Sequence, residues 1–159
     1  MPTILFVCTG NLYRSPLAAA FFRLLLDARG RADWSVSSAG TWTAPGQRVP
    51  PEGLRAASKF GADLLEHRSQ IINAEMLSRA NLVLVMEKGH KEALDLEFPS
   101  ASGKVHLLSQ VVDGLAYDIP DPMIVGGEVE SLAGDLHKLL DKGFESICAL
   151  AEKHRESTD

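Results

Sequence analysis

Two reactive residues lie close together near the start of the chain. Cys8 ends an apolar run, and Arg14 follows six residues later, with Ser15 and Pro16 directly behind it. A thiolate sulfur is a strong nucleophile, and a guanidinium can bind two oxygens of a phosphate at once. A nucleophile beside such a fork indicates phosphoryl transfer to sulfur, with a cysteinyl-phosphate as the intermediate.

The residues between Cys8 and Pro16 are suited to hold an anion. They lead from a buried strand into a helix, where backbone N–H groups and the helix dipole favour negative charge. Gly10 and Asn11 tolerate the positive φ that such a turn needs, and Ser15 can donate a hydrogen bond to the thiolate. Because Arg14, the loop amides and the dipole supply positive charge, we expect no metal and no other cofactor. The predicted phosphate-binding loop consists of Thr9, Gly10, Asn11, Leu12, Tyr13 and Ser15 around the catalytic Cys8 and Arg14.

Each of these residues also has an ordinary structural interpretation. A single cysteine that ends a buried strand is most often a core residue, and an arginine near a strand end is usually solvated. The combination of cysteine, five residues, Arg-Ser and a strand-to-helix turn favours the catalytic interpretation. Cys148, by contrast, lies near the apolar stripe of the last predicted helix and is expected to be a core residue.

The elements that must position these residues alternate between strands and helices. Short apolar runs predict strands at residues 3–8, 34–38, 82–86 and 104–108. Helical patterns occur from Pro16 to Gly30, at 52–60, after a cap at Asn73, at 89–97 and at 128–152. This alternation predicts an α/β fold, a single Rossmann-like domain over residues 1–159 with a four-stranded parallel sheet and helices on both faces. Ligands of such sheets bind beyond the carboxyl ends of the strands, where Cys8 lies.

The composition excludes several classes of partner. The formal net charge is −5 and no basic block stands out, so we expect no nucleic-acid or membrane partner. No apolar run approaches the roughly 20 residues that cross a bilayer, and there is no secretory signal. Two cysteines form no disulfide framework. Together these features predict a cytoplasmic protein with reduced thiols.

The loop resembles a known family signature. The segment Val7 to Pro16 resembles Cys-x-Gly-Asn-x-x-Arg-Ser-Pro at the extreme N-terminus, the signature of low-molecular-weight protein tyrosine phosphatases. The resemblance extends to Ser38-Ala39-Gly40-Thr41, to residues 81–86 and to Asp121-Pro122, and so covers nearly the whole chain. It implies an enzyme that hydrolyses phosphotyrosine in protein substrates.

The resemblance also implies roles for residues outside the loop. Asp121 would be the general acid for the first step and the base that activates water in the second, with Asp118 as the local competitor. Ser38 and His67 would hold Asn11 by hydrogen bonds.

The chain departs from the family pattern at several positions. Tyr13 stands where many members have a second cysteine, so Cys8 would lack a neighbouring resolving thiol. Met123 and Ile124 replace two tyrosines of animal enzymes. They are expected to be apolar pocket walls together with Trp42, which is equally consistent with a packing role.

Two alternative functions remain open for a chain with this loop, and a third is disfavoured by its cysteine content. Members of the family that act on phosphoarginine tend to have threonine where this chain has Leu12, whose apolar side chain fits a phenyl ring better. A non-catalytic module could bind phosphate or a phosphoprotein, although such a module would need neither Cys8 nor Asp121. Arsenate reductases of this fold relay oxidation through a cysteine on a central loop, and residues 61–110 contain none.

Overall fold

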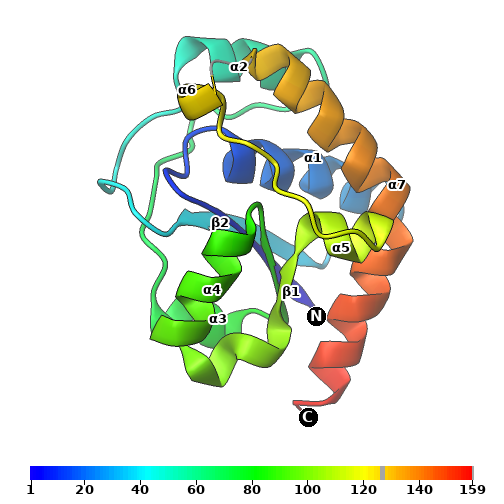
Figure 1. Ribbon diagram of the computed structural model, residues 1–159. Coiled ribbons are helices and arrows are strands. Elements are labelled where there is room, and N and C mark those ends of the chain that lie inside the picture. Colours follow the sequence, from blue (N-terminus) through cyan, green and yellow to red (C-terminus); the bar gives the residue numbers. More distant parts are fainter. Residues whose placement is uncertain (126–127, 159) are drawn as a thin grey trace.

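A parallel sheet forms the centre of the structure (Figure 1). The computed structural model describes residues 1–125 and 128–158, and at residues 124 and 125 it describes the backbone only. In this part of the chain the sheet has four strands in the order β2-β1-β3-β4, all parallel. The strands are β1 (Thr3–Cys8), β2 (Ser35–Gly40), β3 (Leu82–Val85) and β4 (Val105–Leu107). The predicted four-stranded parallel sheet is confirmed.

The helices occur between and after the strands. They are α1 (Arg14–Ala28), α2 (Pro51–Ser58), α3 (Ala74–Arg79), α4 (Lys88–Glu97), the 3-10 helix η1 (Pro99–Lys104), α5 (Leu108–Asp113), α6 (Pro122–Val125) and α7 (Val129–Glu156). The predicted cap at Asn73 is present, since its side chain accepts a hydrogen bond from the N–H of Met76 at 2.8 Å. Local capping therefore sets the start of α3 as the sequence indicated.

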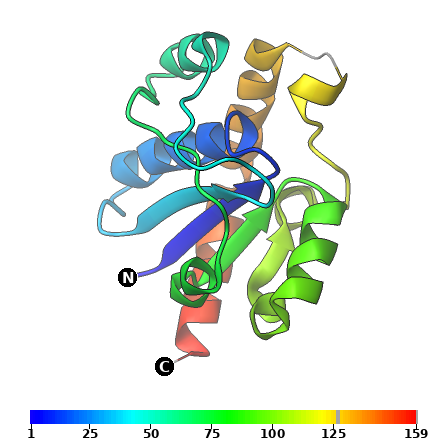
Figure 2. The ribbon, with the colours of Figure 1, turned by 90° about the vertical axis from the view of Figure 1, so that its left-hand side faces the viewer.

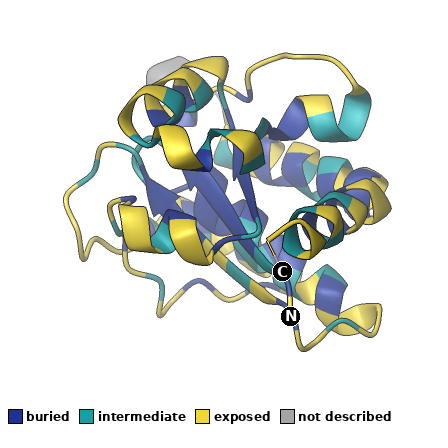
Figure 3. Ribbon diagram, turned by 90° about the horizontal axis from the view of Figure 1, so that it is seen from below, coloured by how far each residue is buried: buried dark blue, intermediate teal, exposed yellow. Residues whose placement is uncertain are grey.

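The helices cover both faces of the sheet (Figure 2). Ile4 and Phe6 of β1 pack into one apolar cluster with residues of α1 and α7, whereas Leu5 and Val7 pack into another with residues of α3 and α4. Successive side chains of a strand point to opposite faces, so a strand covered on both sides must be apolar throughout. The central strands β1 and β3 are accordingly almost entirely buried, whereas the first half of β2 is more exposed. In Figure 3 the outer sides of the helices are exposed.

Some predicted boundaries were wrong. The second strand extends to Gly40 and not to residue 38, because Ala39 and Gly40 pair with Val7 and Cys8. The fourth strand ends at Leu107, where the chain turns into α5. The helices η1, α5 and α6 were not predicted, since segments of six residues or fewer carry too little periodicity to be recognised.

The described chain offers neither a membrane span nor a metal cluster. None of its helices combines the length and apolar character that crossing a bilayer demands. In residues 1–125 and 128–158, no three His, Cys, Asp or Glu side chains are grouped so that they could hold a metal ion.

Candidate active site

The predicted phosphate-binding loop, residues 8–15, lies where β1 ends and α1 begins. Cys8 is the last residue of β1 and Arg14 the first of α1. Tyr13, the N-cap residue of α1, makes no side-chain cap hydrogen bond in the described structure. The N–H groups of the first helical turn therefore keep their positive partial charge for another acceptor. Such an arrangement is suited to bind an anion.

Asn11 holds the loop in its conformation. It has a φ of +57°, the only positive φ of a non-glycine residue in the described chain. Its Nδ2 donates to Ser15 Oγ at 2.8 Å and to Ser38 Oγ at 2.9 Å, and its Oδ1 accepts from the N–H of Gln70 at 3.0 Å. The left-handed conformation is costly for a residue with a side chain, and these three bonds offset the cost.

The backbone of Asn11 is held by a histidine. Nε2 of His67 donates to the carbonyl oxygen of Asn11 at 2.9 Å. Burial lowers the pKa of His67 below its usual 6.5, although the bond to Asn11 acts in the opposite direction. The structure thus brings Ser38 and His67 to Asn11, as the sequence predicted, with the refinement that the amide donates to Ser38.

Gly40 allows the loop to approach β2 closely. A Cβ atom at this position would lie 2.5 Å from the carbonyl oxygen of Thr9 and 3.2 Å from Cβ of Asn11. A side chain at position 40 is therefore excluded by the backbone of Thr9, which cannot move aside as the end of a flexible side chain could. The glycine at the end of β2 is required by the conformation of the phosphate-binding loop.

Cys8 and Ser15 form the reactive pair of the loop. Sγ of Cys8 lies 3.0 Å from Oγ of Ser15, and both residues are buried. Ser15 Oγ accepts a hydrogen bond from Asn11, and its own proton has two acceptors within reach, the sulfur of Cys8 at 3.0 Å and the carbonyl oxygen of Ala39 at 3.4 Å. A hydroxyl that donates to the sulfur stabilises its negative charge.

Arg14 is buried, with a relative exposure of 2%, and its guanidinium contacts acidic and carbonyl oxygens. Nη1 donates to the carbonyl oxygen of Ile119 at 2.8 Å and lies 3.0 Å from Oε1 of Glu87. Nη2 lies 3.6 Å from Oδ2 of Asp121 and 3.5 Å from Oγ1 of Thr9. One nitrogen is therefore held tightly, while the other makes only long contacts and is open to a ligand oxygen.

The segment that carries Asp121, residues 117–122, is called the acid loop here. Its start is fixed by Ser109, whose Oγ donates to the carbonyl oxygen of Tyr117 at 2.6 Å and accepts from its N–H at 3.1 Å. The N–H of Ile119 donates to the carbonyl oxygen of Met86 at the end of β3. The acid loop is thus tied to the sheet through backbone groups.

The two aspartates of the acid loop have different surroundings. Oδ1 of Asp118 accepts from the N–H of Lys88, the first residue of α4, at 2.8 Å. Oδ1 of Asp121 accepts from the N–H of Met123, and its Oδ2 faces Arg14. Asp121 lines the same depression as Cys8, whereas Asp118 lines a different cavity. Of the two, Asp121 is the carboxyl group placed to exchange a proton with a ligand bound at Cys8.

The depression over Cys8 is small, with a volume of about 50 Å³. Its lining comprises Cys8, Gly10, Leu12, Tyr13, Arg14, Asp121 and Met123. The hydroxyl of Tyr13 is directed to Glu52, to which it donates at 2.8 Å, and burial with this bond raises the pKa of Tyr13 to about 12. Only the ring of Tyr13 is therefore available as a wall.

The structure separates the predicted pocket walls. Met123 lines the depression and is 69% exposed. Trp42 does not belong to this lining. Its backbone N–H donates to the carbonyl oxygen of Thr9, but the residue is 83% exposed. The prediction for Ile124 concerns a side chain that lies outside the described residues.

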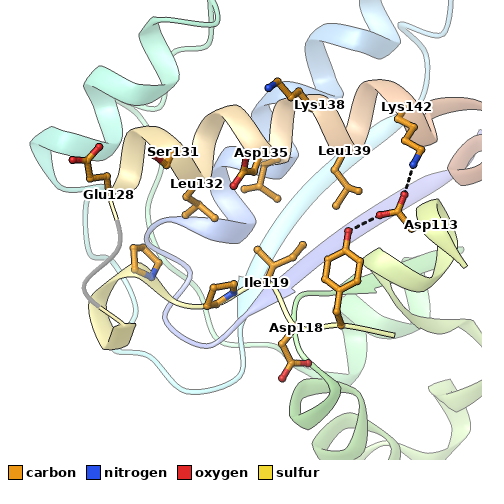
Figure 4. A pocket seen from close by; sticks show the side chains of 14 residues that line it. Asp113, Asp118, Ile119, Glu128, Ser131, Leu132, Asp135, Lys138, Leu139 and Lys142 are labelled. Carbon is orange, nitrogen blue, oxygen red and sulfur yellow. Dashed lines mark hydrogen bonds and ion pairs between the residues drawn. The ribbon is translucent and has the colours of Figure 1, made fainter. Parts of the chain in front are cut away.

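A larger cavity of about 490 Å³ lies behind the acid loop, between this loop and α7. Figure 4 shows Ile119 facing Leu132 and Leu139 across it. Its rim carries Asp113, which accepts hydrogen bonds from the hydroxyl of Tyr117 and from Nζ of Lys142, both at 2.5 Å. None of the residues that line the depression over Cys8 lines this cavity. Its lining comes from both the acid loop and α7.

Sequence reasoning missed several groups that complete the site. The contacts of Arg14 with Glu87 and with the carbonyl of Ile119, and of Asn11 with the N–H of Gln70, join segments more than 50 residues apart. A backbone donor or acceptor can belong to any residue type, so no sequence signal existed for two of these three. Glu87 lies just beyond the carboxyl end of β3, next to the carboxyl end of β1 where Cys8 lies. Its negative charge at that position was the one signal in the sequence for a contact with Arg14.

Comparison with known proteins agrees with this geometry. Residues 3–157 match the family model described as low molecular weight phosphotyrosine protein phosphatase. A protein-arginine-phosphatase of Geobacillus stearothermophilus is 36% identical over 147 residues, which cover 91% of this chain and 95% of the relative. A low molecular weight protein-tyrosine-phosphatase of Streptomyces coelicolor is 33% identical over 133 residues, covering 77% of this chain and 79% of the relative.

A solved structure is similar over most of the chain. The crystal structure of a low molecular weight protein tyrosine phosphatase from T. tengcongensis superposes with a TM-score of 0.84 and 34% identity, and covers 91% of this chain and 99% of that one. The likeness in sequence and in structure thus extends far beyond the loop at Cys8.

Proposed function

The chain belongs to the low-molecular-weight phosphotyrosine protein phosphatase family, and on this basis we propose that it hydrolyses phosphotyrosine in proteins with Cys8, Arg14 and Asp121 as its catalytic residues. The observation that carries this assignment is the meeting of these three residues in one depression. They come from the end of β1, the start of α1 and the acid loop, and each brings a different chemical group. A thiol, a guanidinium fork and a carboxyl group around one anion site are what phosphoryl transfer to sulfur needs.

The reaction proceeds in two displacements. In the first, Sγ of Cys8 attacks phosphorus and forms an S–P bond, the P–O bond to the phenol breaks, and Asp121 gives its proton to the leaving oxygen. In the second, Asp121 takes a proton from water, the water oxygen attacks phosphorus and the S–P bond breaks. Inorganic phosphate leaves, and Cys8 returns as the thiolate that Ser15 stabilises.

Positive charge for both displacements comes from the protein alone. Nη2 of Arg14 and the amides of the phosphate-binding loop face the transferred phosphoryl group, whose negative charge is spread over three oxygens in the transition state. Glu87 keeps Nη1 of Arg14 in place. Both described thiols, Cys8 and Cys148, are free, so a reducing compartment such as the cytoplasm suits this chemistry.

The walls of the depression favour an aromatic substrate. Leu12 and Met123 are apolar and line it beside the ring of Tyr13, which suits a flat phenyl group. The second candidate is phosphoarginine, favoured by the 36% identity with a protein-arginine-phosphatase. A guanidinium leaving group would need polar acceptors in place of these apolar walls, so we assign phosphotyrosine as the substrate.

The test measures turnover on p-nitrophenyl phosphate and then on matched peptides that carry phosphotyrosine or phosphoarginine. We expect Cys8→Ser to remove activity at least 10³-fold, because serine is a far weaker nucleophile at neutral pH. Cys148→Ala is the matched control: its thiol is buried in the core, where burial raises its pKa to about 11. This variant should lose some stability and keep its activity.

The outcomes separate the candidates. Full activity of Cys8→Ser would refute the mechanism, and tight phosphate binding without turnover on any monoester would leave a binding module. Faster hydrolysis of the phosphoarginine peptide would correct the substrate and leave the mechanism intact.

A further inference from the structure

A buried histidine of α4 contacts the phosphate-binding loop at a side chain that the two displacements do not use, the hydroxyl of Thr9. Nε2 of His90 lies 2.8 Å from Oγ1 of Thr9, and His90 is only 5% exposed. The two residues are 81 positions apart in the sequence, so the contact exists only in the folded chain.

The direction of this hydrogen bond follows from the other ring nitrogen. Nδ1 of His90 accepts from the N–H of Glu87 at 3.1 Å, so Nδ1 carries no proton. The proton of the neutral ring is then on Nε2, which donates to Thr9 Oγ1. Burial and the positive charge of Arg14 lower the pKa of His90, whereas Glu87, Asp118 and Asp121 raise it, and the net result is a pKa below 6.5.

Thr9 in turn contacts Arg14. Nη2 of Arg14 donates to Thr9 Oγ1 at 3.5 Å. A hydroxyl oxygen can accept two hydrogen bonds, and His90 and Arg14 use both. The donor from His90 therefore fixes the hydroxyl so that its second lone pair is directed at Arg14.

The contact with Thr9 involves Nη2, the less constrained of the two terminal nitrogens of Arg14. Nη1 is held by short contacts to Glu87 and to the carbonyl of Ile119, whereas Nη2 has only Thr9 at 3.5 Å and Asp121 at 3.6 Å. When Asp121 exchanges its proton with the substrate, its contact with Nη2 changes during the reaction. Thr9 is the one described contact of Nη2 whose state the reaction does not alter.

We propose that His90 and Thr9 are positioning residues that align Nη2 of Arg14 with the phosphoryl group through the hydrogen bonds His90 Nε2–H to Thr9 Oγ1 and Arg14 Nη2–H to Thr9 Oγ1. This inference rests on the proposed function, since it concerns the alignment of the arginine in that reaction. An aligned Nη2 fits the three equatorial oxygens of the transition state better than the tetrahedral phosphate of the bound substrate, so misalignment costs most in the transition state. The loss should therefore fall on kcat more than on KM.

The first pair of variants tests the hydroxyl. Thr9→Val keeps the shape of the side chain and removes the hydroxyl, and we expect kcat on p-nitrophenyl phosphate to fall about tenfold with KM changed less than threefold. Thr9→Ser restores the hydroxyl and should recover most of kcat. Equal activity of the valine and serine variants would overturn the proposal.

The second pair tests whether His90 acts through Thr9. His90→Asn keeps an acceptor near the N–H of Glu87 but cannot reach Thr9, whereas His90→Gln extends a donor amide to the position of Nε2. We expect the asparagine variant to lose about as much kcat as Thr9→Val and the glutamine variant to keep most of it. The double variant Thr9→Val/His90→Asn should be no slower than either single variant, because both remove the same contact.

The result distinguishes this inference from the proposed function. A wild-type protein without turnover on any monoester would refute the function itself. An active wild type whose Thr9 and His90 variants lose kcat as independent factors would refute only the coupling through Thr9. If His90→Asn does not fold, as judged by thermal unfolding, the comparison of Thr9→Val, Thr9→Ser and His90→Gln decides alone.

Discussion

The phosphate-binding loop and the acid loop face the same depression but are built differently. In the phosphate-binding loop, Asn11, Arg14 and Ser15 are buried. The side chains of Asn11 and Arg14 are held by hydrogen bonds to distant parts of the chain, and Ser15 is held within the loop by Asn11. In the acid loop, Asp121 is partly exposed and its neighbour Met123 largely so, and the anchors are backbone groups of Tyr117 and Ile119.

This difference reflects what each loop must do. A cradle for a dianion must keep its donors in place before the ligand arrives, since reorganising them during the reaction would cost free energy. Buried side chains with several hydrogen-bond partners, such as that of Asn11, provide that rigidity. A proton donor needs only to reach the leaving oxygen and then a water molecule, so Asp121 lies at the edge of the site. Disrupting the backbone conformation of the first loop, as opposed to a single contact such as that of the Thr9 hydroxyl, should affect binding and catalysis together. Disrupting the second loop should affect catalysis alone.

Among changes to the residues that support the two loops, the largest effect is expected from Asn11→Ala. This change removes three side-chain hydrogen bonds and leaves a non-glycine residue in the left-handed conformation without support. We expect kcat/KM to fall about 10²-fold or more and the free energy of unfolding to fall by about 2–4 kcal/mol. Phosphate affinity, measured by competitive inhibition, should weaken as well.

Asn73→Ala is the matched control for this prediction. It also removes an asparagine that stabilises the backbone, the N-cap of α3, and should cost about 1 kcal/mol of stability. Its activity should equal that of the wild type. Comparable loss of activity in the two variants would mean that the loop responds to general destabilisation and not to its own bonds.

The sequence predicted the phosphate-binding loop well because the loop is local. The residues from Cys8 to Ser15 are adjacent, and their types carry the signal: an asparagine for the turn, and a cysteine and an arginine for the chemistry. Of the two residues expected to tolerate a positive φ, Asn11 adopts one and Gly10 does not. The same holds for the alternating strands and long helices, whose periodicity extends over many residues.

The supports of the site could not be predicted in the same way. The carbonyl of Ile119 and the N–H of Gln70 act as backbone groups, so their residue types are irrelevant to the contact. His90 was given no role, because nothing in the sequence shows that α4 places it against Thr9. Trp42 was expected either to form a pocket wall for an aromatic substrate or to be a packing residue, but the loop that carries it leaves it 83% exposed. Local chemistry is readable from residue types, whereas long-range contacts depend on the fold.

An intermediate effect is expected from Ser109→Ala, which releases the acid loop. The buried hydroxyl makes two hydrogen bonds to the backbone of Tyr117, and without it both backbone groups lose their partner. Stability should fall by about 1–3 kcal/mol. We expect kcat to fall up to tenfold on phenyl phosphate and less on p-nitrophenyl phosphate, whose better leaving group needs less help from Asp121.

Inhibition by inorganic phosphate tests whether the acid loop acts separately from the phosphate-binding loop. The inhibition constant of phosphate should change less than twofold in the Ser109 variant. Ser131→Ala provides the control, because Ser131 is an exposed serine on the opposite wall of the cavity behind the acid loop (Figure 4). Its replacement should change neither kcat nor inhibition by inorganic phosphate. If phosphate binding weakened as strongly as kcat in Ser109→Ala, the two loops would not be separable in the way proposed.

The smallest effect is expected far from both loops, at a pair of histidines that joins β4 to the end of α7. Nε2 of His106 lies 3.0 Å from Nε2 of His154, and their rings are stacked. Burial lowers the pKa of both rings below 6.5. Positive charge on His154 and Lys91 lowers the pKa of His106 further, and Lys153 and Lys104 do the same for His154. The folded state therefore resists protonation more than the unfolded chain does.

The sign of the pH dependence follows from these lowered values. Above pH 6.5 both states leave the rings neutral, so the contribution of the pair to stability is complete. As the pH falls below 6.5 the unfolded chain binds protons first, and stability is lost until the folded state is protonated too. His154→Gln cannot titrate, so its free energy of unfolding, measured by urea titration from pH 8 to pH 5, should decline less than that of the wild type. Its kcat at each pH should match the wild type, because the pair contacts neither loop; a shifted pH–rate profile would show that the two ends of the molecule are coupled.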